Sequence, residues 1–172
     1  MRTEVLVLVI FLLLSVSCRN EPEKRKAPGK PGGQEMADLN RYLVQKDREI
    51  IQNYIERKDL KMTESPTGLW YLIRFEGDGK FLKDNERIVM DYKCELLDGT
   101  VCYSSENLGP KQIILGKTDV EPGLNEGLRL LKPGAEALFI LPPFLAFGLV
   151  GDGKKIPPRT IIVYSVNILS EK

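Results

Sequence analysis

The residues RIVMDYKCELLDG, positions 87–99, carry the clearest strand pattern of the chain. Apolar side chains recur at alternate positions, so one face of the predicted strand carries Met90, Tyr92, Cys94 and Leu96. A period of two residues is typical of a β-strand that buries one face. The Asp98-Gly99 pair that follows is a strong signal for a β-hairpin turn. The stretch therefore predicts a half-buried strand that turns back on itself.

Other short apolar segments lie on both sides of this hairpin. Further strands are predicted at residues 69–75, 112–115, 135–141 and 161–169. Leucine spacing predicts a short helix over residues 123–131, which Lys132-Pro133-Gly134 ends. Most connections are too short for parallel crossovers. We therefore expect an α+β fold, in which an antiparallel twisted half-barrel sheet wraps on one short helix, with an N-terminal helix in addition.

Residues 36–62 are predicted to form that N-terminal helix. Apolar residues recur mostly at steps of three and four, at Leu39, Leu43, Ile50, Ile51, Tyr54 and Ile55. Asp47 interrupts the apolar stripe, so the pattern also allows a break in the helix near this residue. A single stripe fits a helix that packs at the edge of the domain. A helix that pairs two copies of the chain is the alternative.

The beginning of the chain is similar to an export signal. Arg2 precedes the apolar run Val5–Leu14, which is too short to cross a bilayer and suits the core of a signal peptide. The residues Leu14-Ser15-Val16-Ser17-Cys18 resemble a bacterial lipoprotein box, in which the cysteine is diacylated and becomes the new N-terminus. We therefore expect residues 1–17 to be a lipoprotein signal peptide and Cys18 to be lipidated. A plain signal followed by an unmodified cysteine is the alternative.

A polar segment separates Cys18 from the predicted helix. Residues 19–35 read RNEPEKRKAPGKPGGQE and contain no large apolar side chain that a core could bury. We expect residues 18–35 to be a lipid-anchored flexible tether, and residues 63–172 to be a strand-rich domain. This organisation predicts a membrane-anchored lipoprotein of the cell envelope that faces the periplasm from the outer membrane.

The chain of 172 residues contains no histidine and three cysteines, and its formal net charge is +1. The absence of histidine excludes a Ser-His-Asp or Cys-His nucleophile and any zinc site that needs imidazole. The near-neutral charge argues against electrostatic binding of nucleic acid. We therefore expect neither a metal nor a cofactor. Cys94 and Cys102 flank the predicted hairpin, and the sequence leaves open whether they form a disulfide.

Residues 87–169 resemble the FK506-binding type of peptidyl-prolyl isomerase along almost their whole length. The similar segments follow the family's order with close to its spacing: Val89-Met90-Asp91-Tyr92, Leu97-Asp98-Gly99, Tyr103-Ser104-Ser105, Leu115-Gly116, 120–128, Lys132-Pro133-Gly134, 141–143, 145–148, 155–158 and 162–166. The leading helix, the Gly68-Leu69-Trp70-Tyr71 segment and residues 151–159 resemble a subgroup of lipoproteins associated with bacterial gliding motility. The resemblance implies an isomerase domain over residues 63–172 whose partners are proline-containing exported proteins.

The resemblance also implies a set of site residues. Tyr92, Phe147 and Tyr164 take the catalytic positions, and the substrate-binding positions fall on Cys102, Tyr103, Val120, Glu121, Leu124 and Ile156.

Several of these residues depart from the family's commonest pattern. Leu124 stands where tryptophan is usual, Phe147 replaces the flap tyrosine, and Glu121 replaces an apolar residue. Cys102 occupies an aromatic position and Tyr103 an aspartate position, although a slip of one residue would place Tyr103 in the aromatic position. These departures predict weakened activity.

The expected reaction is rotation about an X–Pro amide, whose barrier is about 18–20 kcal/mol because resonance holds the C–N bond planar. Rotation needs neither a proton transfer nor a nucleophile, so a chain without histidine can perform it. A dry pocket with aromatic walls and a few hydrogen-bond donors lowers the barrier by accepting the twisted amide. The sequence therefore supports an envelope prolyl isomerase. The alternative is a catalytically weak binding or chaperone module that uses the same groove.

Overall fold

A computed structural model describes residues 32–169 of the chain. The chain divides into two compact units, Met1–Met36 and Ala37–Lys172, and the sheet and its helices belong to the second. The predicted signal peptide, Cys18 and nearly all of the predicted tether lie outside the described residues. Within the described range, no helix combines the length and the apolar character that crossing a membrane requires.

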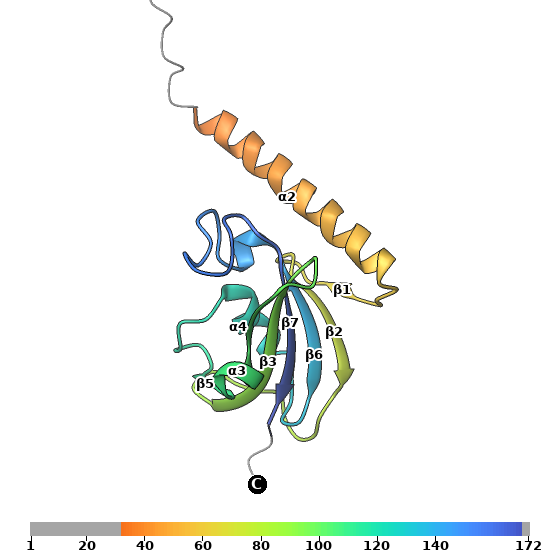
Figure 1. The fold of residues 1–172 in the computed structure, drawn as a ribbon, viewed down its shortest axis with the longest axis vertical. Coiled ribbons are helices and arrows are strands. Elements are labelled where there is room, and N and C mark those ends of the chain that lie inside the picture. The colour runs from red at the N-terminus through yellow and green to blue at the C-terminus, as the bar shows by residue number, and fades with distance from the viewer. Residues whose placement is uncertain (1–31, 170–172) are drawn as a thin grey trace, which may run out of the picture. The chain divides into compact units, whose positions relative to one another are not determined.

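The centre of the second unit is an antiparallel sheet of seven strands (Figure 1). The strands are β1 (Thr63–Glu64), β2 (Trp70–Phe75), β3 (Arg87–Leu96), β4 (Val101–Ser104), β5 (Lys111–Ile114), β6 (Glu136–Leu141) and β7 (Ile162–Ile168). Their order is β1-β2-β6-β7-β3-β4, and β5 also pairs with β3. Every pairing is antiparallel. This architecture confirms the predicted α+β fold.

The long strand β3 organises the sheet. One of its edges pairs with β7 from Met90 to Leu96. The other edge is shared, because β5 pairs with residues 87–90 and β4 pairs with residues 93–95. Met90 and Cys94 are fully buried, as the alternation of this stretch predicts. Cys94 lies opposite Tyr103 rather than Cys102, and both cysteines are free.

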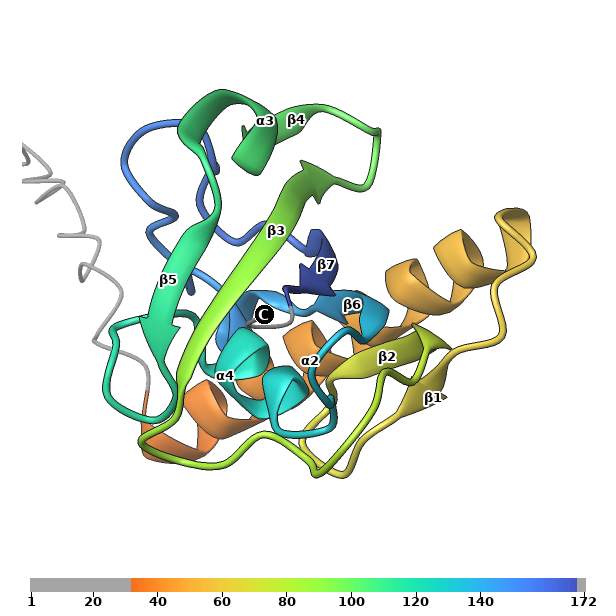
Figure 2. The ribbon, with the colours of Figure 1, turned by 90° about the horizontal axis from the view of Figure 1, so that it is seen from below.

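The short helix α4 (Pro122–Leu128) lies on the inner side of the curved sheet (Figure 2). Leu124 and Leu128 are completely buried there. The helix approaches β6 so closely that a Cβ atom on Gly127 would lie 2.8 Å from ring atoms of Phe139. Only glycine permits this approach without displacement of the ring, so Gly127 determines how near α4 lies to the sheet.

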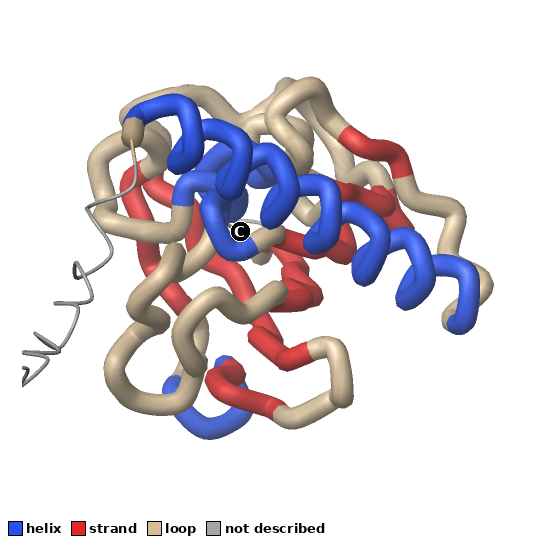
Figure 3. Tube along the Cα trace, turned by 90° about the horizontal axis from the view of Figure 1, so that it is seen from above, coloured by secondary structure: helices blue, strands red, loops and turns tan. Residues whose placement is uncertain are grey.

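The helix α2 (Gly33–Arg57) is continuous, without the break that the sequence allowed at Asp47 (Figure 3). It begins three residues earlier than predicted and ends five residues before position 62, and Asp59 adopts a positive φ of 50° just beyond its end. Ile51 is buried in a second apolar cluster that includes Trp70, Ile140 and Val163 of the sheet. The part of α2 from residue 37 onward therefore packs at the edge of the domain.

Three short elements lie outside the predicted ones: β1, the helix α3 (Ser105–Leu108) and the 3₁₀ turn η1 (Pro143–Leu145). β4 is the returning strand of the predicted hairpin. The predicted helix over residues 123–131 also ends earlier, at Leu128. Its last turn tightens, because the amides of Arg129, Leu130 and Leu131 each donate to the carbonyl three residues before.

Candidate functional site

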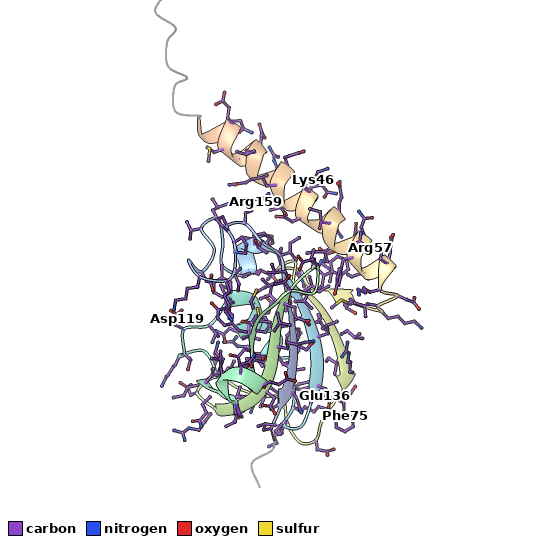
Figure 4. The ribbon with its side chains drawn as sticks, viewed as in Figure 1. Lys46, Arg57, Phe75, Asp119, Glu136 and Arg159 are labelled. Carbon is purple, nitrogen blue, oxygen red and sulfur yellow. The ribbon has the colours of Figure 1, made fainter. Side chains whose placement is uncertain are left out.

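A cavity of about 520 Å³ opens between the sheet, the residues before α4 and the β6–β7 connection. We call this connection, residues 142–161, the flap. The cavity walls include six of the residues that the family resemblance implied: Tyr92, Tyr103, Val120, Glu121, Phe147 and Tyr164. Asp119 also lines it, on the loop that leads into α4 (Figure 4).

Two tyrosines from neighbouring strands form one wall. Tyr92 on β3 is paired with Val166 on β7, so Tyr164 is its diagonal neighbour on the same face. The two ring centroids are 6.4 Å apart and the ring planes are inclined by 43°. This geometry leaves an aromatic surface facing the cavity. Both rings stand on paired strands, so the sheet fixes the positions of their Cα atoms.

Tyr164 connects this wall to the residue that precedes α4. Its hydroxyl donates a hydrogen bond of 2.8 Å to the Oε1 atom of Glu121. Burial raises the pKa of Tyr164 well above its usual value, and the nearby Glu121 carboxylate raises it further. Tyr164 therefore stays protonated and acts as a permanent donor to Glu121.

A second hydrogen bond holds the flap against β4. The hydroxyl of Tyr103 donates to the Oδ2 atom of Asp152. The other oxygen, Oδ1, accepts from the backbone amides of Lys154 at 2.9 Å and Ile156 at 2.8 Å. We call the Tyr103–Asp152 hydrogen bond the latch.

The latch changes the acidity of both partners. Desolvation acts to raise the pKa of Asp152. The hydrogen bonds that Asp152 accepts from the Tyr103 hydroxyl and from backbone amides outweigh desolvation and lower this pKa to about 2. The hydrogen bond to Asp152 raises the pKa of Tyr103 to about 12. The latch is therefore in its donor–acceptor state across the physiological pH range.

The end of the flap is anchored to α2. Arg159 extends from the flap toward that helix (Figure 4), and its Nη2 atom donates to Asp47 at 2.8 and 2.9 Å and to the carbonyl of Leu43 at 3.1 Å. The backbone amide of Arg159 donates to the carbonyl of Gly148, which closes the part of the flap between these two residues. Asp47, the residue that interrupts the apolar stripe, is thus a buried partner for the flap.

Three of the residues that the resemblance placed in the pocket lie elsewhere. Cys102, Leu124 and Ile156 are buried in the main hydrophobic core and do not line the cavity. The Sγ atom of Cys102 lies 3.6 Å from the carbonyl of Lys155, beneath the flap. Its neighbour Tyr103 faces the cavity, because successive residues of β4 point to opposite sides of the sheet.

Four charged residues that the sequence analysis did not single out also line the cavity: Lys111, Asp119, Asp152 and Lys154. The Gly151-Asp152-Gly153 sequence could have indicated Asp152, since such a triplet favours a side chain that bonds its own turn. Lys111 reaches the cavity only because β5 pairs with β3, and its Nζ atom lies 5.8 Å from the Tyr92 ring centroid. Across residues 32–169, no group of three His, Cys, Asp or Glu side chains could hold a metal ion.

Comparison with known proteins agrees with this fold and cavity. A family model described as FKBP-type peptidyl-prolyl cis-trans isomerase matches residues 78–169. The probable FKBP-type isomerase FkpA of Neisseria meningitidis is 36% identical over 126 residues, which cover 73% of this chain and 45% of that protein. FkpA of Escherichia coli is 33% identical over 127 residues, which cover 74% of this chain and 46% of that protein.

A solved structure is similar over a longer stretch. The crystal structure of FkpA from Escherichia coli superimposes with a TM-score of 0.63 and 25% sequence identity, over 99% of this chain and 81% of that one. The chain spans about half the length of the curated relatives it matches. The matched family model, the identity to these relatives and the shared fold lead to one conclusion: the chain belongs to the FKBP-type peptidyl-prolyl cis-trans isomerase family.

Proposed function

We propose that this protein is a peptidyl-prolyl cis-trans isomerase that acts on exported proteins. The observation that carries the proposal is the cavity whose walls bring together Tyr92, Tyr103, Phe147 and Tyr164 on the fold of this family. Catalysis of prolyl amide rotation requires a surface that accepts the twisted bond and excludes most of the water around it. Aromatic walls supply such a surface.

Hydrogen-bond donors orient the peptide in this proposal. Among residues 32–169, no hydrogen bond occupies the Tyr92 hydroxyl, which is therefore free to donate to a peptide carbonyl. Phe147 contributes an aromatic ring but no donor, and the Tyr103 hydroxyl is already committed to Asp152. Because Phe147 stands where the family usually has a tyrosine, the cavity has one hydrogen-bond donor fewer than the family's usual pattern, which supports the prediction of a weakened isomerase.

A protease-coupled assay with a proline tetrapeptide tests the proposal. We expect acceleration of the cis-to-trans step over buffer, and a loss of at least about tenfold in Tyr92→Phe, which retains the ring and removes the donor. Tyr54→Phe on α2 is the matched control, because Tyr54 does not line the cavity. A folded wild-type protein with the rate of buffer would exclude the enzymatic function.

A binding module is the second candidate, and the flap supports it. Leu149 and Val150 are consecutive apolar residues that remain 72% and 78% exposed at the flap. An exposed apolar pair beside a peptide-sized cavity fits contact with unfolded chains. We expect the wild type to slow aggregation of a reduced, unfolded test protein and the L149S/V150S double variant to lose that effect. Equal protection by both proteins would exclude this role for the flap.

We also propose that the protein is a lipoprotein of the cell envelope. The apolar run before Cys18 and the polar residues after it support an exported, acylated chain that faces the periplasm from the outer membrane. Metabolic labelling with a radioactive fatty acid should label the wild type and not Cys18→Ser. Labelling of both proteins would overturn lipidation at Cys18.

The resemblance to gliding-associated lipoproteins supports a role in an envelope machine for motility. Deletion of the gene should abolish colony spreading, and complementation with the wild type should restore it. Unchanged spreading of the deletion strain would exclude this role.

A further inference from the structure

Glu121 is a buried acid in the wall of the cavity. The residue is only 9% exposed, although it lines the cavity together with Tyr92 and Tyr164. Its Oε1 atom accepts the hydrogen bond from Tyr164, and its Oε2 atom is buried without a partner within the described part of the chain. A buried carboxylate oxygen without a donor is costly and rare, so it calls for a physical explanation.

The internal structure of the domain does not use this oxygen. Glu121 occupies the position that precedes α4, yet its side chain makes no capping hydrogen bond. Among residues 32–169, none of the ion pairs includes Glu121. Lys111, a base on the same cavity, lies over the Tyr92 ring instead. Neither capping nor pairing with a base accounts for the acid.

The chemistry of the group defines what it can bind. An ionised carboxylate has acceptor sites and no donor, so its natural partner is an N–H group, and a charged one binds most strongly. The terminal torsion of a glutamate is broad, so rotation about the Cγ–Cδ bond can change the direction in which Oε2 points. Three acids, Glu121, Asp119 and Asp152, and two bases, Lys111 and Lys154, line the cavity, so the acids outnumber the bases by one.

We propose that Glu121 forms a subsite for a cationic side chain, a lysine ammonium or an arginine guanidinium, in the proline peptide that the cavity binds. This inference rests on the proposed function, since it assigns substrate specificity to the same cavity. The family resemblance implies an apolar residue at this position, so a preference for basic peptides would be a property of this chain's own sequence.

A peptide series tests the subsite. The probes are proline tetrapeptides that carry lysine or norleucine on either side of the proline, because norleucine has a straight chain and no charge. We expect the wild type to bind at least one lysine peptide roughly 10-fold to 100-fold more tightly than its norleucine counterpart, by titration calorimetry. In Glu121→Gln, which retains size and an acceptor for Tyr164, this preference should fall to within about twofold.

Matched variants separate the subsite from general charge and from folding. Asp119→Asn removes an exposed acid of the same cavity and should retain most of the lysine preference. Tyr164→Phe removes the partner of Oε1 but leaves the carboxylate, so it should retain the preference too. If Glu121→Gln does not fold, the Asp119→Asn result still decides. Loss of the preference in that variant would place the subsite at Asp119 and overturn the proposal, and retention of the preference would support Glu121.

The outcomes distinguish this inference from the proposed function. Prolyl isomerisation without any preference for lysine over norleucine overturns the subsite and leaves the isomerase standing. An unchanged preference in a folded Glu121→Gln also overturns it. Peptide binding with a lysine preference but no catalysis overturns the isomerase and supports the subsite. Absence of both binding and catalysis overturns the two together.

Discussion

The ion pair between Asp47 and Arg159 allows a sharp test of how α2 supports the flap. Its side chains are 8% and 31% exposed, whereas Glu64 and Arg48, which join the same helix to β1, are 23% and 49% exposed. Alanine at position 47 or position 64 therefore breaks one ion pair of α2 in each case. Only the first of these ion pairs reaches the flap.

The difference in burial determines the expected magnitudes. Removing one partner of a fully buried ion pair costs about 3–5 kcal/mol, because the other charge remains buried. Arg159 is one third exposed and retains the Leu43 carbonyl, so we expect Asp47→Ala to cost about 2 kcal/mol. Glu64→Ala should cost less than about 1 kcal/mol, as for an exposed pair.

The effect of pH on Asp47 has a definite sign. Burial raises the pKa of Asp47 above 3.8, although Arg159 opposes this. The folded protein then holds this proton more tightly than the unfolded chain, so this group alone makes stability fall as the pH rises above about 4. The two variants are therefore compared at one fixed pH, so that this titration does not vary between the measurements.

Urea unfolding measures the loss of stability, and hydrogen exchange measures the flap. The Arg159 amide, which donates to Gly148 at 3.0 Å, should lose protection by up to roughly 30-fold in Asp47→Ala and little in Glu64→Ala. Equal destabilisation by the two variants, or unchanged exchange across the flap in a destabilised Asp47→Ala, would refute the anchoring argument.

The latch, the contact between α4 and β6, and the buried thiol of Cys94 can each be tested by one variant or one reagent. Tyr103→Phe should lower the free energy of unfolding by about 1 kcal/mol. Because the pKa of Asp152 is lowered to about 2, Asp152 stabilises the wild type above its usual pKa, and this stabilisation is lost as the pH falls from 4 to 2. The variant should show less of this acid-dependent loss, and an acid unfolding curve identical to that of the wild type would contradict the latch. Gly127→Ala should lower the free energy of unfolding by about 1–3 kcal/mol in chemical denaturation, although alanine favours a helix more than glycine does, because the new methyl group meets the Phe139 ring. Adding Phe139→Leu to this variant should recover part of the loss. If the effects of the two substitutions simply add, the clash is contradicted. Burial raises the pKa of Cys94 to about 12. Iodoacetamide at pH 8 should therefore modify this thiol only after the protein unfolds. Modification of Cys94 in the folded protein, detected by mass spectrometry, would contradict its burial.

The cavity could be predicted in part from residue types. Tyr92 and Tyr164 lie where the resemblance implied, because each stands on a regular strand whose alternation the sequence carries. The latch between Tyr103 and Asp152 could not be predicted, since it joins residues 49 positions apart through the conformation of a loop. Cys102 and Leu124 carry apolar side chains that suit a pocket wall or a core equally, and composition cannot distinguish the two.

Sequence alone determined the strand pattern and its antiparallel character. The period of two residues in RIVMDYKCELLDG and the Asp98-Gly99 turn are local signals, and local signals depend on backbone geometry and not on distant contacts. It also determined that any catalysis here proceeds without histidine. These properties are set by residue identity and order, and tertiary packing does not change them.

The pairing of the buried polar groups depends on the folded chain. The sequence marked Asp47 as an interruption of an apolar stripe, and only the folded chain brings it to Arg159. Likewise, only the folded chain shows that Oε1 of Glu121 accepts from Tyr164 and that Oε2 is buried without a partner among the described residues. The physical reason is burial, because a carboxylate that water would solvate anywhere on a surface needs a specific partner inside a protein.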